Sequence, residues 1–205
     1  MSVRRPTAIW ILTSSFIAYV DGVMNDATPR RAVALVGRPN VGKSALFNRL
    51  LGRRLAIVHA LWGVTRDRLS GEADWNGQRF EAIDTGGIGV MDQAAAADAI
   101  AAGARRQADL AIEEAGAVIQ VADVQTGVHP LDVEVARLLR RRGRPVFLAV
   151  NKCDDPSRDD EAATFAELGF PWFPVSALQR RGLDELMDAV LSALPPPEPN
   201  PTSVQ

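Results

Sequence analysis

The sequence holds a single cysteine and only two histidines among its 205 residues. Cys153 alone cannot form an internal disulfide, and a lone thiol favours a reducing compartment, for which the cytoplasm is the default. His59 and His129 lack neighbours typical of catalysis or metal binding, so we expect both in loops or on the surface. Positive charge is not in excess either, because 23 Lys and Arg stand against 25 Asp and Glu. The net charge of -2 gives no reason for nonspecific nucleic-acid binding, so we expect no direct DNA binding. The same net charge is compatible with a local basic patch.

An apolar run long enough to cross a bilayer is missing as well. The best candidate, Ala8–Val20, is interrupted by polar residues and is shorter than the ~20 residues that a spanning helix needs. It also has no small-x-small cleavage site at its end, so it fits a signal peptide poorly. We expect no membrane association. We interpret residues 1–30 as an N-terminal extension, of which 1–23 precede the native start at Met24.

The rest of the chain alternates between short apolar runs and amphipathic stretches. Asn76-Gly77 between two extended runs predicts a hairpin, which adds one antiparallel strand. The alternation predicts a mostly parallel sheet with helices on both faces, and such sheets bind ligands beyond the carboxyl ends of their strands. The expected strands are Ala32–Val36, Leu69–Trp75, Gln78–Ile83, Ala117–Val121, Pro145–Val150 and Trp172–Val175. The expected helices are one carrying Leu46, Phe47, Leu50 and Leu51, then Gln93–Ala115, Leu131–Arg142, Glu161–Leu168 and Leu183–Leu194.

The length suits one compact domain with tails. We expect this domain at 31–194, followed by a linker at 195–205, where five prolines forbid a helix. A linker at this place suggests that the natural chain continues into another domain.

A phosphate-binding loop follows the first strand. GRPNVGKS matches G-x-x-x-x-G-K-[ST] and lies between a strand and a helix, as the motif requires. Its backbone N–H groups would surround the phosphates, Lys43 would reach the β- and γ-phosphates, and the Ser44 hydroxyl would bind magnesium. The alternative, a chance Gly-rich turn, does not explain the context. The expected phosphate contacts here are Gly37, Arg38, Pro39, Asn40, Val41, Gly42, Lys43, Ser44 and Ala45.

DTGG follows the second strand of the hairpin. Asp84 is placed to hold magnesium through a water, and Gly87 to donate its N–H to the γ-phosphate. A simple turn has the same composition, and only the spacing after the first motif favours the functional interpretation. Further phosphate contacts are expected at Asp84, Thr85, Gly86, Gly87 and Ile88.

Thr65, in GVTRDR, lies between the first helix and the hairpin. A threonine there would coordinate magnesium while the γ-phosphate is present and release it after hydrolysis. Taken alone, it would be an ordinary loop residue. We predict magnesium ligands at Ser44, Thr65 and Asp84, and catalytic contacts at Lys43, Thr65 and Gly87.

NKCD, Asn151 to Asp154, follows a later apolar strand and selects the base. The Asp154 carboxylate would accept both the N1–H and the amine of guanine, whereas adenine offers no such donor pair. Asn151, Lys152 and Cys153 complete this loop. Ser176 and Ala177, after the next strand, would supply a backbone N–H to the guanine oxygen, although an ordinary loop would contain the same residues.

Together GRPNVGKS, GVTRDR, DTGG, NKCD and Ser-Ala resemble the EngA/Der family of bacterial ribosome-assembly GTPases, from Arg31 to Leu194. The resemblance implies a P-loop NTPase fold, magnesium-dependent GTP hydrolysis and a role in assembling the large ribosomal subunit. Family members carry two GTPase domains and a KH-like domain, so this chain looks like the first GTPase domain. It departs from the family at Trp62, where proline is common, and at Ala45, where threonine is common.

One functional alternative remains open, and a second is disfavoured. Ile88 stands where Ras-like enzymes carry a catalytic Gln, so the domain would also suit a nucleotide-dependent interaction module with negligible hydrolysis. NKCD argues against a P-loop kinase or ATPase.

If hydrolysis occurs without Gln, a potassium ion near the β–γ bridge would offset the developing charge, with Asn40 as its candidate ligand. The alternative role for Asn40 is to stabilise the turn of the loop.

Overall fold

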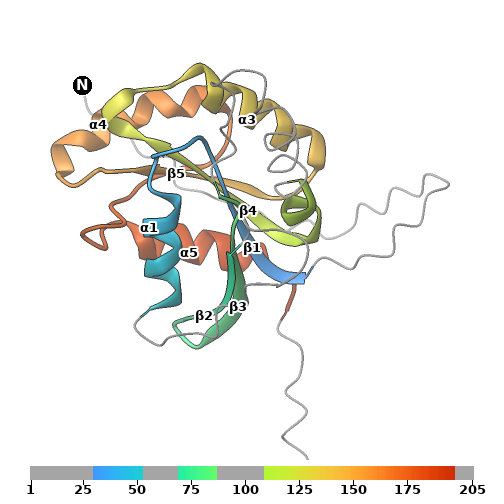
Figure 1. Cartoon of the computed structure of the whole chain (residues 1–205). Coiled ribbons are helices and arrows are strands. Elements are labelled where there is room, and N and C mark those ends of the chain that lie inside the picture. The colour runs from blue at the N-terminus through green and yellow to red at the C-terminus, as the bar shows by residue number, and fades with distance from the viewer. Residues whose placement is uncertain (1–29, 53–68, 87–108, 197–205) are drawn as a thin grey trace, which may run out of the picture.

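The computed structural model describes residues 30–52, 69–86 and 109–196. One six-stranded sheet, ordered β2-β3-β1-β4-β5-β6, forms its centre (Figure 1). β2 and β3 pair antiparallel and all other neighbours pair parallel, which confirms the predicted fold class. The strands are β1 (Arg30–Val36), β2 (Leu69–Trp75), β3 (Gln78–Asp84), β4 (Ala115–Asp123), β5 (Val146–Asn151) and β6 (Trp172–Pro174). The α-helices are α1 (Lys43–Leu51), α3 (Pro130–Arg142), α4 (Asp159–Ala162) and α5 (Leu183–Ser192), and the 3-10 helices are η1 (Val124–Thr126), η2 (Pro156–Arg158) and η3 (Ala163–Leu168).

The hairpin between β2 and β3 turns at the predicted Asn-Gly pair. Asn76 and Gly77 have φ angles of 51° and 81°, and a two-residue turn of this kind needs positive φ at both positions. The Asp74 side chain accepts the N–H of Gly77 at 2.9 Å, which fixes the turn. Local chemistry therefore sets the one antiparallel pairing of the sheet.

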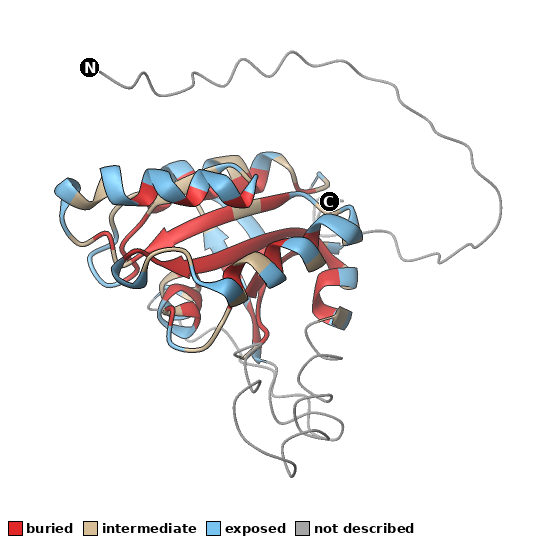
Figure 2. Ribbon diagram, turned by 90° about the horizontal axis from the view of Figure 1, so that it is seen from above, coloured by how far each residue is buried: buried red, intermediate tan, exposed pale blue. Residues whose placement is uncertain are grey.

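Helices cover both faces of the sheet, and β1 shows why. Val33 and Leu35 point into a cluster with α1 and α5, whereas Ala32 and Ala34 point into a second cluster that includes α3. Successive side chains of a strand alternate between faces, so an all-apolar strand must be covered on both. Figure 2 shows the result: buried strands lie between helices whose outer faces are exposed.

The segment expected to be one helix at Glu161–Leu168 is different in the structure: only Glu161 and Ala162, the end of α4, are α-helical, and the rest is the 3-10 helix η3. The buried residues are Ala162, Phe165 and Leu168, spaced by three. A spacing of three stays on one face of a 3-10 helix, which has three residues per turn, but drifts around an α-helix. The burial pattern therefore explains the correction.

The other helix and strand boundaries differ less from those expected from the sequence. The strand expected at Ala117–Val121 extends to Ala115–Asp123 and all nine residues are buried, because β4 lies between β1 and β5. The helix expected at Gln93–Ala115 lies mostly outside the described residues; 109–114 are helical, and Ala115 already begins β4. Within the described ranges, no helix combines the length and apolar character needed to cross a membrane.

Candidate nucleotide-binding site

The loops that carry GRPNVGKS, DTGG, NKCD and Ser-Ala follow the carboxyl ends of β1, β3, β5 and β6. β1, β3, β4, β5 and β6 run parallel, so these ends lie at one edge of the sheet. This edge is where open α/β sheets bind ligands.

The phosphate loop bends through unusual backbone angles. Asn40 and Gly42 have φ angles of 64° and 97°, in the left-handed region. Gly42 caps α1 without a side-chain hydrogen bond, so the first N–H groups of the helix stay available for an anion. Inside the loop, Lys43 is 5% exposed and its Nζ donates to the Arg38 carbonyl at 2.8 Å. Burial lowers the pKa of Lys43 to about 8, which a neighbouring phosphate would oppose.

Ser44 and Asp84 join the phosphate loop to the DTGG loop. The Ser44 hydroxyl donates to Asp84 Oδ2 at 2.8 Å, and the Gly86 N–H donates to Asp84 Oδ1 at 3.2 Å. Thr85 Oγ1 donates to the Leu35 carbonyl at 2.8 Å, which holds this loop against β1. A hydroxyl and a carboxylate side by side fit Mg²⁺, which takes oxygen ligands and few of them from the protein.

The NKCD loop is joined to both neighbouring loops by Asn151. Its Nδ2 donates to the Val41 carbonyl at 2.9 Å, and its Oδ1 accepts the Ala177 N–H at 3.0 Å. Ser176 Oγ donates to Asp154 Oδ1 at 2.5 Å, so the carboxylate expected to read the base is already oriented. The phosphate loop, the NKCD loop and the Ser-Ala loop therefore form one connected unit.

Lys152 and Cys153 contribute in ways that the motif alone does not show. Lys152 has a φ of 66°, and its Nζ lies 2.6 Å from Asp123 Oδ2. The Cys153 side chain is buried, its N–H donates to the Val175 carbonyl at 3.0 Å, and burial raises the pKa of its thiol to about 11. Cys153 thus fixes the loop to the strand end and offers no reactive thiolate.

The N–H groups expected to bind the guanine oxygen have protein partners. Ala177 donates to Asn151, as above, and Ser176 donates to the Arg181 carbonyl at 2.9 Å. Among the described residues, the next N–H, that of Leu178, has no partner. The Leu178 side chain is 75% exposed.

Besides Asp123, which pairs with Lys152, two residues of this region escaped the sequence reasoning. Arg49 of α1 donates to the carbonyls of Ala177 and Leu178, at 2.9 and 2.8 Å, and so fixes the Ser-Ala loop to the helix behind the phosphate loop. Leu178 is the second. Its only signal in the sequence is an apolar residue directly after Ser-Ala.

Residues 1–29, with Met24, lie outside the described part of the chain, and so do five single residues considered for the site. They are His59, Trp62, Thr65, Gly87 and Ile88.

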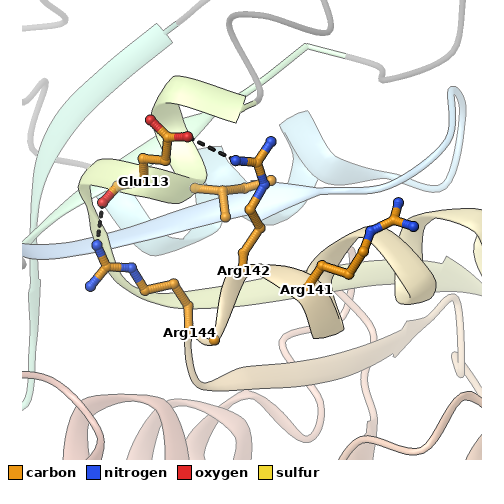
Figure 3. A pocket seen from close by; sticks show the side chains of 6 residues that line it. Glu113, Arg141, Arg142 and Arg144 are labelled. Atoms are coloured by element: carbon orange, nitrogen blue, oxygen red, sulfur yellow. Dashed lines mark hydrogen bonds and ion pairs between the residues drawn. The ribbon is translucent and has the colours of Figure 1, made fainter. Parts of the chain in front are cut away.

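A cavity of about 360 Å³ lies near the opposite edge of the sheet, where α3 ends and β4 begins (Figure 3). Two of its three arginines, Arg142 and Arg144, form ion pairs or hydrogen bonds with the protein. Arg142 pairs with Glu113 at 2.8 Å and with Asp109 at 2.7 Å, and Arg144 donates to the Glu113 carbonyl at 2.5 Å. This basic patch therefore fastens two elements together. The lining residues are Ile112, Glu113, Arg141, Arg142, Gly143 and Arg144.

The strand–GRPNVGKS–helix unit, with an NKCD loop bound to it at the same sheet edge, defines the class of P-loop GTPase domains. Residues 32–152 match the family described as 50S ribosome-binding GTPase. The chain belongs to that family.

Individual relatives agree with this assignment and with the resemblance to the Der family, which they confirm. A protein named GTPase Der from Christiangramia forsetii is 49% identical over 164 residues, covering 80% of this chain and 37% of the relative. Among solved structures, an Aquifex aeolicus Era variant bound to GDP·AlF4⁻ is 32% identical with a TM-score of 0.66, covering 84% of this chain and 60% of that one. Era bound to MgGDPNP and nucleotides 1506–1542 of 16S ribosomal RNA is 31% identical, with the same TM-score and coverage. The chain thus spans little more than a third of the curated relative.

Proposed function

We propose that this domain binds GTP and GDP and hydrolyses GTP to GDP and phosphate with magnesium. The observation that carries the proposal is the position of Asn151, whose amide bonds both the phosphate loop and the Ser-Ala loop. A loop that selects guanine is thereby fixed to a loop that binds phosphates.

At the phosphate end, the backbone of the loop from Gly37 to Ser44 surrounds the phosphates and Lys43 supplies the cation. Lys43 leaves the Arg38 carbonyl for the phosphates when nucleotide binds. Mg²⁺ would be held by the Ser44 hydroxyl, by Asp84 and by Thr65, and it would neutralise charge that develops on the phosphate oxygens. Gly87 would donate its N–H to the γ-phosphate.

At the base end, Asp154 accepts the N1–H and the amine of guanine, while Ser176 holds its carboxylate in place. Asn151 and Lys152 support the loop. The Ala177 N–H donates to Asn151, whereas the Leu178 N–H has no partner among the described residues, so Leu178 is the candidate donor for the guanine oxygen. The exposed Leu178 side chain would cover the base.

In the cell, we propose that the domain acts as a switch in assembly of the large ribosomal subunit. The proposal is supported by the family description and by relatives named GTPase Der. We place the domain at 31–194, between the extension 1–30 and the linker 195–205, and expect it in the cytoplasm.

Two measurements test the proposal. Calorimetry with GDP and with ADP should give binding for GDP and at least a hundredfold weaker binding for ADP, because ADP leaves Asp154 unpaired. Phosphate release from GTP should then require magnesium. Binding without phosphate release would favour the alternative of an interaction module with negligible hydrolysis, which the Ile88 position already suggests. Equal binding of GDP and ADP would overturn the proposal.

A further inference from the structure

Asp132 is a fully buried carboxylate near the start of α3. Its Oδ2 accepts the His129 N–H at 3.1 Å, which forms part of the helix cap. Oδ1 has no hydrogen-bond partner in the described part of the chain, and Arg38 Nε lies 3.4 Å from it. Burial raises the pKa of Asp132, and the Arg38 charge opposes that rise. The cap of α3 needs only a hydrogen-bond acceptor at Asp132 and no buried charge. The contact between Asp132 and Arg38 therefore serves another purpose than capping the helix.

Arg38 belongs to the phosphate loop, but its guanidinium is held elsewhere. Besides Asp132, Nη2 donates to Thr126 Oγ1, and the side chain is only 12% exposed. The Arg38 carbonyl accepts the Lys43 Nζ at 2.8 Å. The backbone carbonyl of Arg38 thus contacts Lys43, and the side chain of Arg38 contacts the segment between β4 and α3.

The same segment reaches the base loop at its other end. Asp123 Oδ2 lies 2.6 Å from Lys152 Nζ, and Thr126 Oγ1 also donates to the Asp123 carbonyl at 3.0 Å. Gln120 adds a hydrogen bond from inside the sheet, because its Nε2 donates to the Asp132 carbonyl at 2.8 Å. Residues 123–132 therefore contact the loops at both ends of the nucleotide site.

We propose that Arg38 and Asp132 form a positioning pair that fixes the phosphate loop relative to the base loop through residues 123–132. The inference rests on the proposed binding of guanine nucleotides. The two side chains act through the loop backbone and through the position of Lys43. Breaking a buried pair leaves one charge uncompensated. Replacing either Arg38 or Asp132 alone should therefore displace the phosphate loop.

The test is a double-mutant cycle with Arg38→Gln, Asp132→Asn and both together. Asn keeps the size and the acceptor of the cap, and Gln keeps much of the side-chain length. Glu134→Gln is the matched control, because Glu134 is an exposed acid two residues further along α3. GDP and GMP affinities are measured by competition with a fluorescent GDP analogue, and melting temperatures are measured without nucleotide.

We expect each single variant to lose GDP affinity by about tenfold or more and the double variant to lose no more than either single. GMP affinity should fall less, because it lacks the β-phosphate that the loop and Lys43 hold. A purely structural role would lower both affinities equally, and additive losses would show that the residues do not act as a pair; either result overturns the inference. If Asp132→Asn does not fold, the GDP-to-GMP ratio of Arg38→Gln alone decides. Absence of GDP binding in the wild type would instead overturn the proposed function.

Discussion

The side-chain amide of Asn151 donates to the backbone carbonyl of Val41 at 2.9 Å and so closes the base loop onto the phosphate loop, 110 residues earlier in the chain. This contact leaves no room for a side chain at Gly42, the residue after Val41. A Cβ added at Gly42 would overlap the Asn151 Nδ2 atom, and the Gly42 φ of 97° is one that L side chains rarely adopt. The glycine of the phosphate motif therefore serves the base loop as well.

Replacing this glycine should damage the site, and the chain offers a matched control. Gly143, directly after α3, has a φ of 64° in the left-handed region, as Gly42 does, and nothing within 4 Å of an added Cβ. Gly143→Ala should cost only the strain of a left-handed residue, about 1–2 kcal/mol. Gly42→Ala should lose more stability and at least tenfold in GDP affinity, because Asn151 must move. Melting temperature and GDP titration check this; equal effects of the two variants would contradict it.

Lys43→Ala should abolish tight triphosphate binding, because it removes the side-chain cation expected to reach the β- and γ-phosphates. Stability without nucleotide should not fall by much. Burial lowers the pKa of Lys43 to about 8, so the loop alone accommodates the charged amine poorly. The measurements are GTP calorimetry and the melting temperature of the nucleotide-free protein, with the exposed Arg137→Ala as control. Retained wild-type GTP affinity would refute the assignment of the phosphate loop.

Asp154→Asn should weaken GTP and improve xanthosine triphosphate, because the amide presents a donor where the carboxylate presented an acceptor. Two charge-assisted hydrogen bonds are lost, worth roughly 1.5–3 kcal/mol each, so GTP affinity should drop by about a hundredfold or more. The Ser176 hydroxyl, 2.5 Å from Asp154 Oδ1, can still donate to the amide oxygen and keep the group in place. Competition between the two nucleotides measures the switch, and an unchanged preference would mean that NKCD does not read the base.

Much of the fold was predictable because it depends on local patterns. The hairpin turn follows from Asn76-Gly77, and the two-sided cover of β1 follows from its unbroken apolar run. The single helix expected at Glu161–Leu168 was wrong, because period-three burial and period-3.6 burial look alike over eight residues.

The connections within the site were less predictable. Sequence motifs give residue types at the ends of strands, but not which side chains meet. Arg38 with Asp132 and Arg49 with Ala177 are contacts between elements far apart in the chain, and neither pair has a spacing rule that would reveal it. Asp123 was missed for a simpler reason: it lies beyond the end of the strand as expected from the sequence.

Asn40 has two candidate roles, and its backbone now makes them separable. Its φ of 64° is in the left-handed region, which Asn tolerates better than most residues, so the turn-stabilising role has a physical basis. The other role, as a potassium ligand near the β–γ bridge, depends on the side-chain oxygen. Asn40→Gly removes that oxygen and keeps the backbone angle accessible, whereas Asn40→Ala removes the oxygen and strains the turn.

We predict that wild-type GTP hydrolysis is faster in potassium chloride than in sodium chloride at fixed ionic strength, because a cation at this place offsets charge on the leaving oxygens. Asn40→Gly should lose the potassium response while it keeps GDP affinity, and Asn40→Ala should lose the potassium response together with part of its GDP affinity. Phosphate release in the two salts and GDP titration measure these effects. Equal wild-type rates would end the idea of a potassium site, and a response that survives in Asn40→Gly would place the ion on other ligands and leave Asn40 with the turn alone.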